Sequence, residues 1–145
     1  MSEQPYINTM DIFPLEAPEQ NQLHKFYDSL RENRLTTTKC AKCGLVSWPP
    51  RTVCPSCMSD ELEWIDLPKK GKLYTCTVQF AGVSPSFEVP LYLGMVEFDN
   101  GLKIFSKIVE ATEDDMEIGR EVELTVIEVP GPFDRVIHAF KPTRR

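Results

Sequence analysis

Two short stretches decide how this chain folds: Cys40-Ala41-Lys42-Cys43-Gly44 and Cys54-Pro55-Ser56-Cys57. Each contains a Cys-x-x-Cys pair, and ten residues separate Cys43 from Cys54. Such a pair forms a tight knuckle in which two thiolates approach one ion while backbone N–H groups donate to the sulfurs, and Gly44 permits the turn. Two knuckles together complete a tetrahedron. The pattern therefore predicts one Zn²⁺ bound by Cys40, Cys43, Cys54 and Cys57.

Three other interpretations of these pairs are two disulfides, a redox-active Cys-x-x-Cys, and an iron site of the rubredoxin kind. The N-terminus lacks the basic start and apolar run of a secretory signal, which indicates a reducing cytoplasm and disfavours disulfides. The insert between the knuckles is short for a rubredoxin, and the double spacing favours zinc. Because four thiolates leave no position for water, we expect a structural ion that contributes on the order of 10 kcal/mol to folding.

An amphipathic helix is predicted on the N-terminal side of the first knuckle. Its apolar residues fall at i, i+3, i+4 and i+7, namely Leu23, Phe26, Tyr27 and Leu30. Pro18 is placed to open this helix, which is expected to end near Asn33. The residues before it contain several prolines and no steady period, so they indicate an extended arm.

The part of the chain after the second knuckle is rich in predicted strands. Apolar and polar residues alternate along Tyr74–Phe80, the period of a half-buried strand. Four more strands are expected at Leu91–Phe98, Leu102–Val109, Val122–Val129 and Arg135–Phe140. Asp99-Asn100-Gly101 predicts a hairpin turn between the second and third.

Five strands of this length favour a closed OB-type barrel, because closure removes the exposed edges that short strands would otherwise present. The fold class is therefore mainly β, with an N-terminal helix, a rubredoxin-like zinc ribbon and a five-stranded OB-fold barrel. We divide the chain into an extended arm (1–17), the helix and zinc ribbon (18–68) and the OB-fold domain (69–145).

The charge of the chain restricts its partners. The formal net charge is −6 over 145 residues, and neither half is basic. Neutralising phosphates requires clustered Lys and Arg, so the balance argues against a protein whose main ligand is nucleic acid. No apolar run approaches the length of a membrane span, and we expect a cytoplasmic protein without a membrane partner.

The sequence offers no set of residues for catalysis by the chain alone. Of its two histidines, His24 is expected on the surface and His138 in the core. Cys76 alternates with apolar neighbours and is expected to be a small core residue, not a nucleophile. A non-catalytic scaffold or accessory subunit is the resulting prediction, since a nucleophile with a base or an open metal is needed for an independent enzyme.

The chain resembles a known family, the zinc-ribbon and OB-fold proteins associated with acyl-CoA metabolism that were long classed as a domain of unknown function. The resemblance covers nearly the whole sequence. It rests on the helix residues above, on the two knuckles with Pro49-Pro50-Arg51 between them, and on the later stretches Gly71, Pro90-Leu91-Tyr92 and Glu97-Phe98-Asp99-x-Gly101. One departure is that Leu91 separates Pro90 from Tyr92, which are usually adjacent in the family.

The resemblance implies an accessory subunit that pairs with a thiolase-superfamily acyl-CoA acyltransferase in a hetero-oligomer and helps to form the channel for CoA thioesters. The loop Ala81–Pro90 carries Phe87 between prolines and could line that channel or be an ordinary exposed hairpin loop. The residues predicted to contact CoA or the acyl group are Arg51, Lys69, Lys70, Lys72, Phe87 and Tyr92. The alternatives are a subunit of an acyl-CoA hydratase complex and a single-stranded nucleic-acid-binding protein.

Overall fold

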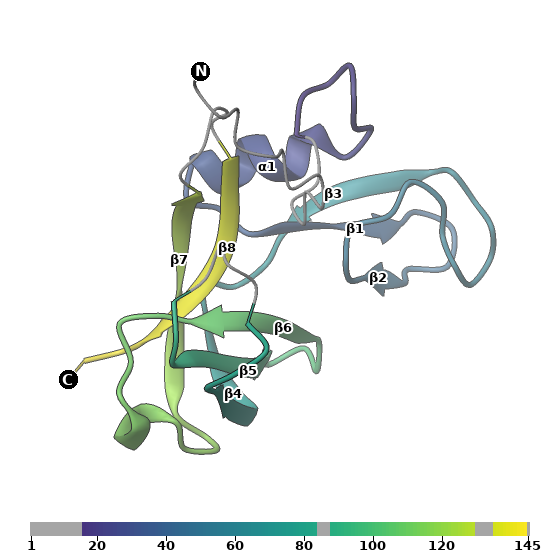
Figure 1. The fold of residues 1–145 in the computed structure, drawn as a ribbon. Helices are drawn as coiled ribbons and strands as arrows, with labels where there is room; N and C mark the ends of the chain where they lie inside the picture. Colours follow the sequence, from purple (N-terminus) through teal and green to yellow (C-terminus); the bar gives the residue numbers. More distant parts are fainter. Residues whose placement is uncertain (1–15, 84–87, 130–134, 145) are drawn as a thin grey trace, which may run out of the picture.

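The structure is a computed structural model that describes residues 16–83, 88–129 and 135–144. The elements in these ranges are α1 (His24–Arg31), β1 (Thr36–Cys40), β2 (Val46–Ser47), β3 (Leu62–Asp66), β4 (Lys70–Gln79), β5 (Leu91–Glu97), β6 (Lys103–Ile108), η1 (Glu113–Asp115), β7 (Glu121–Val129) and β8 (Arg135–Pro142). Figure 1 shows the small sheet β1–β3 to one side of the barrel strands β4–β8, with α1 beside both the small sheet and β8. None of the described helices is both long and apolar enough to cross a membrane.

The first sheet is the ribbon that carries the two knuckles. Its strand order is β2-β1-β3, with both pairs antiparallel. The three consecutive threonines are the first three residues of β1, and all three are buried. The Thr37 hydroxyl donates to the Ser47 carbonyl, and the Thr38 hydroxyl accepts the Arg51 N–H at 2.9 Å. Buried hydroxyls in such a small sheet are tolerated where they have hydrogen-bond partners, and these two bonds connect β1 to the insert.

The second sheet is a closed barrel of order β4-β5-β6-β8-β7. Only the β6–β8 pair is parallel among these described strands, and β4 closes the barrel by pairing with β7. This is the OB-fold topology, so the predicted fold class is confirmed. β4 begins at Lys70, before the predicted start at Tyr74, because Lys70 and Lys72 pair with Glu123 and Glu121 of β7. The domain division after residue 68 stays a prediction.

The hairpin turn between β5 and β6 has the predicted sequence Asp99-Asn100-Gly101. Gly101 has φ +80°, a conformation that side chains other than glycine's rarely adopt. Its N–H donates to the Phe98 carbonyl at 2.8 Å, and the Asn100 side chain accepts the Leu102 N–H at 3.0 Å. The local sequence was therefore sufficient to predict this connection.

Helix α1 begins at His24, later than the predicted start at Pro18. Residues 17–21 form a turn in which the Asn21 N–H donates to the Ala17 carbonyl at 2.9 Å. The Asn21 side chain then accepts the Leu23 N–H at 2.8 Å. Asparagine side chains compete for backbone groups in this way, which delays the helix.

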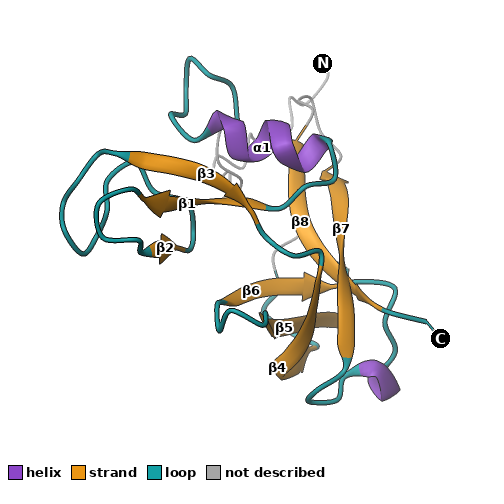
Figure 2. Ribbon diagram, turned by 180° about the vertical axis from the view of Figure 1, so that it is seen from behind, coloured by secondary structure: helices purple, strands orange, loops and turns teal. Residues whose placement is uncertain are grey.

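One hydrophobic core joins the helix to both sheets. Phe26 and Leu30 of α1 lie in the same buried cluster as Leu67 and the barrel residues Ile104 and Phe140. α1 contacts β8 and β1, and Figure 2 shows it from behind, lying over the ribbon and beside β8. The ribbon and the barrel are thus held together through the helix.

A buried carboxylate strengthens this junction. Glu16 accepts the Val136 N–H of β8 at 2.9 Å and forms an ion pair with Arg31 of α1. Its side chain is 7% exposed, whereas that of Arg31 is 37% exposed. Loss of the carboxylate would leave a buried N–H without its acceptor.

We expect Glu16→Ala to lower the free energy of unfolding by about 1–3 kcal/mol, because it removes the acceptor for the Val136 N–H and the partner of Arg31. Urea unfolding measures the change. Glu19→Ala is the control, since Glu19 is exposed in the same turn and its replacement should have an effect within about 0.5 kcal/mol. Equal effects of the two substitutions would show that Glu16 does not hold the helix to the barrel.

Candidate metal centre and apolar pocket

The two knuckles bring four cysteine sulfurs together. Cys40 ends β1, Cys43 lies in the following turn, and Cys54 and Cys57 lie in the loop between β2 and β3. The turn is closed at Gly44, which has φ +74° and whose N–H donates to the Cys40 carbonyl at 2.9 Å. All four sulfurs lie within 4.8 Å of one another.

This arrangement fits a tetrahedral metal ion. The Sγ atoms of Cys40 and Cys57 are 3.5 Å apart, and those of Cys43 and Cys54 are 3.6 Å apart. A zinc ion with Zn–S bonds of about 2.3 Å requires sulfurs about 3.8 Å apart at the corners of a tetrahedron. The four cysteines are therefore arranged to bind a metal ion, and they would leave no position for a reacting water.

The pKa values of the cysteine thiols also favour a bound cation at this site. The backbone N–H of Cys57, followed by that of Ser56, stabilises the Cys54 thiolate and lowers the pKa of Cys54 to about 7. The Ser59 N–H favours the Cys57 thiolate too, but the neighbouring thiols and burial outweigh it and raise the pKa of Cys57 to about 12. Thiolates so close together repel one another, and a divalent cation removes that repulsion.

The fifth cysteine lies apart from this centre. Cys76 is half-buried on β4 and packs against the barrel core, as predicted. Its Sγ lies 3.3 Å from the Met116 carbonyl oxygen, to which the thiol donates. Cys76 is therefore a matched control for the metal-binding cysteines.

A pocket of about 580 Å³ lies where helix, ribbon and barrel meet. Three separate parts of the chain supply its walls: α1 with the residue before it, the insert between the knuckles, and strands β5, β6 and β8 of the barrel. The lining residues are Leu23, Phe26, Tyr27, Trp48, Pro49, Pro50, Leu91, Leu93, Phe105, Ser106, Lys107, Val136, Ile137 and His138.

The pocket lies over the face of an OB-fold that commonly binds ligands, the second and third strands of the barrel. Here these strands are β5 and β6, and their outward residues Leu93 and Phe105 are apolar. Phe105 is 58% exposed. The ribbon contributes Trp48, whose ring centroid is 5.8 Å from that of Phe26 and 5.4 Å from that of His138, both in edge-to-face geometry.

His138 corrects one expectation from the sequence. It was predicted to be a core residue, but it is half-buried and lines the pocket beside Trp48. Burial lowers the pKa of His138 below its ordinary value, although its Nε2 lies 3.4 Å from the Phe105 carbonyl oxygen, a contact that favours the charged form. His138 is therefore neutral at neutral pH.

The residues predicted to contact CoA do not lie together. Arg51 is exposed and follows Pro50, which lines the pocket. The three lysines are exposed at the start of β4, where the Lys70 ammonium lies 3.4 Å from Glu121, and β4 contributes no lining residue to the pocket. Tyr92 packs against the barrel core. Phe87 lies outside the described residues, and the assignment of all six to CoA stays a prediction.

Sequence reasoning missed most of the pocket. Leu91 and Leu93 line it, whereas Tyr92 between them faces the core with Gly94 and Val96. The alternation along β5 could have indicated the lining leucines. Buried Val96 and Phe98 mark the inward face of the strand, so the leucines at odd positions lie on the outward face. Nothing in the local sequence indicated that this outward face would share a pocket with Trp48.

We expect Cys54→Ser to abolish stoichiometric metal binding and to increase hydrogen exchange throughout β1–β3, because three thiolates cannot close the tetrahedron. Metal analysis and hydrogen-exchange mass spectrometry measure the two effects. Cys76→Ser, the control, should retain the metal. Full metal content in Cys54→Ser would exclude this site as the ligand set.

Comparison with sequence families gives two adjacent matches. The family described as "ChsH2, rubredoxin-like zinc ribbon domain" matches residues 28–63, and "ChsH2, C-terminal OB-fold domain" matches residues 64–126. Together they cover most of the chain, in the same order as the two sheets of the structure.

Three curated relatives share part of the sequence. A probable enoyl-CoA hydratase alpha subunit of Thermomonospora curvata is 28% identical over 71% of this chain and 32% of its own length. The benzoylsuccinyl-CoA thiolase subunit BbsA of Thauera aromatica is 34% identical over 61% of this chain and 60% of its own length. A DUF35 domain-containing scaffold protein of Methanothermobacter thermautotrophicus is 33% identical over 66% of this chain and 73% of its own length. The chain thus spans about a third of the first relative and 60% of the second.

A solved structure has the same architecture. The chain matched in the Ltp2-ChsH2(DUF35) aldolase superposes with a TM-score of 0.70 at 27% identity, over 81% of this chain and 91% of that one. The sequence matches, the shared fold and the four grouped cysteines agree with one another. The chain is a member of the DUF35 family, in which a ChsH2-type zinc ribbon precedes an OB-fold domain.

Proposed function

We propose that this protein is a non-catalytic, zinc-binding accessory subunit of a thiolase-superfamily acyl-CoA acyltransferase complex. Its relatives support this assignment: one is named as a thiolase subunit and another as a scaffold protein. The described residues contain no nucleophile paired with a base and no metal site with an open position, so the reacting groups would belong to the partner.

The observation that carries the proposal is the apolar pocket on the barrel's ligand-binding face. OB-folds that bind single strands carry a basic groove with aromatic residues on which bases stack. In this protein the corresponding strands present Leu91, Leu93 and Phe105, and the ribbon adds Trp48 and two prolines. An apolar wall with little positive charge suits an acyl or pantetheine chain better than a phosphate backbone.

The metal centre has a structural role in this proposal. The insert that carries Trp48 and Pro50 begins one residue after Cys43 and ends one residue before Cys54, so the bound zinc fixes both of its ends. The insert forms one wall of the pocket. Zinc would therefore hold the acyl-binding surface in shape without taking part in the reaction.

The CoA moiety would extend from the pocket to positive charge nearby. Arg51 adjoins the pocket through Pro50, and its guanidinium suits phosphate. The three lysines are a second candidate, although carboxylates are close to them, as Lys70 forms an ion pair with Glu121. Arg51 is the preferred candidate because it directly follows Pro50, a lining residue of the pocket.

A hydratase partner is the second candidate function. It is supported by the relative named as a probable enoyl-CoA hydratase alpha subunit, of which this chain spans only 32%. Both partners handle CoA thioesters, so the pocket would serve the same purpose in either complex.

Co-purification tests the proposed partner. The affinity-tagged chain, expressed in its native host, should recover a thiolase-fold subunit and contain about one zinc per chain. Recovery of a hydratase would favour the second candidate. A chain that elutes alone, or with nucleic acid whose binding falls steeply as salt rises, would contradict the accessory-subunit assignment.

Charge reversal tests the position of CoA. We expect Arg51→Glu to weaken binding of dodecanoyl-CoA to the chain about tenfold, because a charge-assisted hydrogen bond to phosphate is lost. Isothermal titration calorimetry measures the affinity. The comparison variant is Lys69→Glu/Lys70→Glu/Lys72→Glu, which changes the other predicted cluster. Unchanged affinity in both variants would remove all four residues from the site.

A further inference from the structure

One side-chain atom among the described lining residues of the apolar pocket can accept a hydrogen bond but cannot donate one. The pocket has five polar lining side chains in the described ranges, namely Tyr27, Trp48, Ser106, Lys107 and His138. The first four all carry hydrogen on their polar atoms, so each can donate. The neutral imidazole of His138 has one protonated nitrogen and one bare nitrogen, and the bare nitrogen only accepts.

The contacts of His138 determine which of its nitrogens is bare. Nε2 lies 3.4 Å from the Phe105 carbonyl oxygen, and a carbonyl oxygen accepts but does not donate. Nε2 therefore carries the proton, and Nδ1 keeps its lone pair. No donor to Nδ1 is found in the part of the chain that the structure describes.

This acceptor is held in a fixed position and is not enclosed. The imidazole centroid is 5.4 Å from that of Trp48 and 6.3 Å from that of Phe26, both in edge-to-face geometry, which restrains the ring. Within the described ranges, the side-chain atoms that are both buried and unpartnered belong to Thr36 and Arg120, so Nδ1 is open to its surroundings. A ligand in the pocket can therefore reach it.

An open acceptor in an apolar wall selects a ligand by its hydrogen-bond donor. A ligand that displaces water without donating to Nδ1 would leave this nitrogen unpaired, which weakens binding. An apolar chain with one O–H or N–H pairs with the nitrogen and still packs against the leucines and aromatic rings. A carboxylate or a phosphate diester has no hydrogen to donate at neutral pH.

We propose that the pocket binds an apolar chain with one hydrogen-bond donor, which donates to Nδ1 of His138. The donor is either a hydroxyl on the acyl group or an amide N–H of the pantetheine arm that joins the acyl group to CoA. The inference rests on the proposed function, in which the pocket receives the acyl or pantetheine chain, and it adds the polar group that the site selects.

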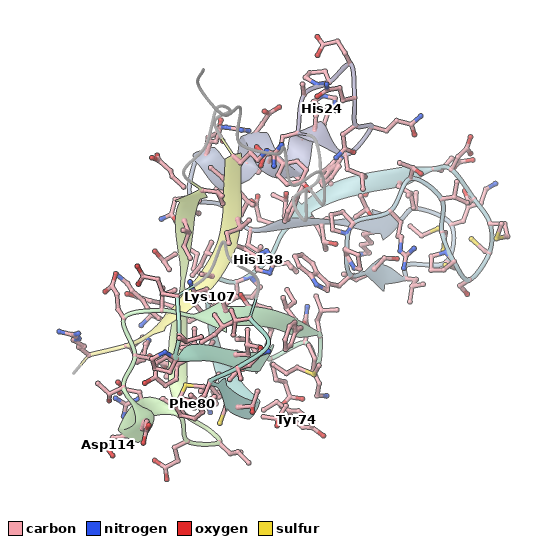
Figure 3. All side chains as sticks on the ribbon, viewed as in Figure 1. His24, Tyr74, Phe80, Lys107, Asp114 and His138 are labelled. Atoms are coloured by element: carbon pink, nitrogen blue, oxygen red, sulfur yellow. The ribbon has the colours of Figure 1, made fainter. Side chains whose placement is uncertain are left out.

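Nitrogen NMR of the full, metal-loaded chain tests the proposal. The chain has two histidines, which lie apart in Figure 3, with His138 on β8 and His24 near the start of α1. His24 does not line the pocket, so His24→Phe leaves the signals of His138 alone and should not alter binding. We expect a protonated Nε2 and a bare Nδ1 in the unbound protein, and an upfield shift of the Nδ1 resonance when a ligand donates to it.

Two CoA thioesters distinguish the two sources of the donor. Dodecanoyl-CoA has the pantetheine amides but no hydroxyl on its acyl group, whereas 3-hydroxydodecanoyl-CoA has both. An Nδ1 shift with both thioesters assigns the donor to the amide. A shift with 3-hydroxydodecanoyl-CoA alone assigns it to the acyl hydroxyl.

Calorimetric titration of variants measures the contribution of the acceptor to affinity. His138→Phe keeps a ring but has no acceptor, so it should weaken binding of the thioester that donates about fivefold. Dodecanoyl-CoA should be unaffected if the donor is the acyl hydroxyl. His138→Asn should retain the affinity, because its Oδ1 is bonded to Cγ as Nδ1 is. His24→Phe is the matched control and should bind both thioesters as the original chain does.

Three results would overturn the proposal. They are a protonated Nδ1 in the unbound protein, an Nδ1 resonance that neither bound thioester shifts, and a loss of affinity in His138→Asn as large as that in His138→Phe. In each case binding of dodecanoyl-CoA to the original chain would leave the acyl-binding function standing. If neither thioester binds the original chain, the inference fails together with the proposed acyl site, while co-purification tests the accessory-subunit role independently.

Discussion

Four cysteine sulfurs within 4.8 Å of one another are the constraint on which the rest of the structure depends. Sulfurs this close cannot all ionise without a cation between them, so a bound metal ion would stabilise the folded ribbon. The consequence reaches beyond the knuckles. The insert between Cys43 and Cys54 is fixed at both ends, which places Trp48 and the two prolines after it over the barrel.

A second constraint positions the helix. Glu16 connects β8 to α1 through the Val136 N–H and Arg31, and Phe26 and Leu30 enter the core shared with the barrel. The small ribbon could not bury enough apolar surface to hold a fixed position by itself. The helix, the ribbon and the barrel each supply part of the walls of the apolar pocket.

The side chains on the β5–β6 face distinguish this barrel from other OB-folds. The OB barrel offers the face of β5 and β6 to ligands in many proteins, and the side chains there decide which ligand fits. Leu93 and Phe105 make that face apolar, and Trp48 and the two prolines after it supply another wall of the same pocket. In the proposed function this surface would receive one part of a substrate, and the partner enzyme would carry out the reaction.

The sequence by itself determined the features that depend on short-range chemistry. Cysteine spacing determined the metal ligands to be expected, alternation determined the barrel strands, and Asp99-Asn100-Gly101 determined a turn that requires φ above zero. Only the tertiary structure decided the closure of β4 on β7 and the pocket. Leu91 and Leu93 look in sequence like the outer face of an ordinary strand. The residues that form the other walls of the pocket, such as Trp48, lie far away in the chain, and no local pattern indicates that they come together.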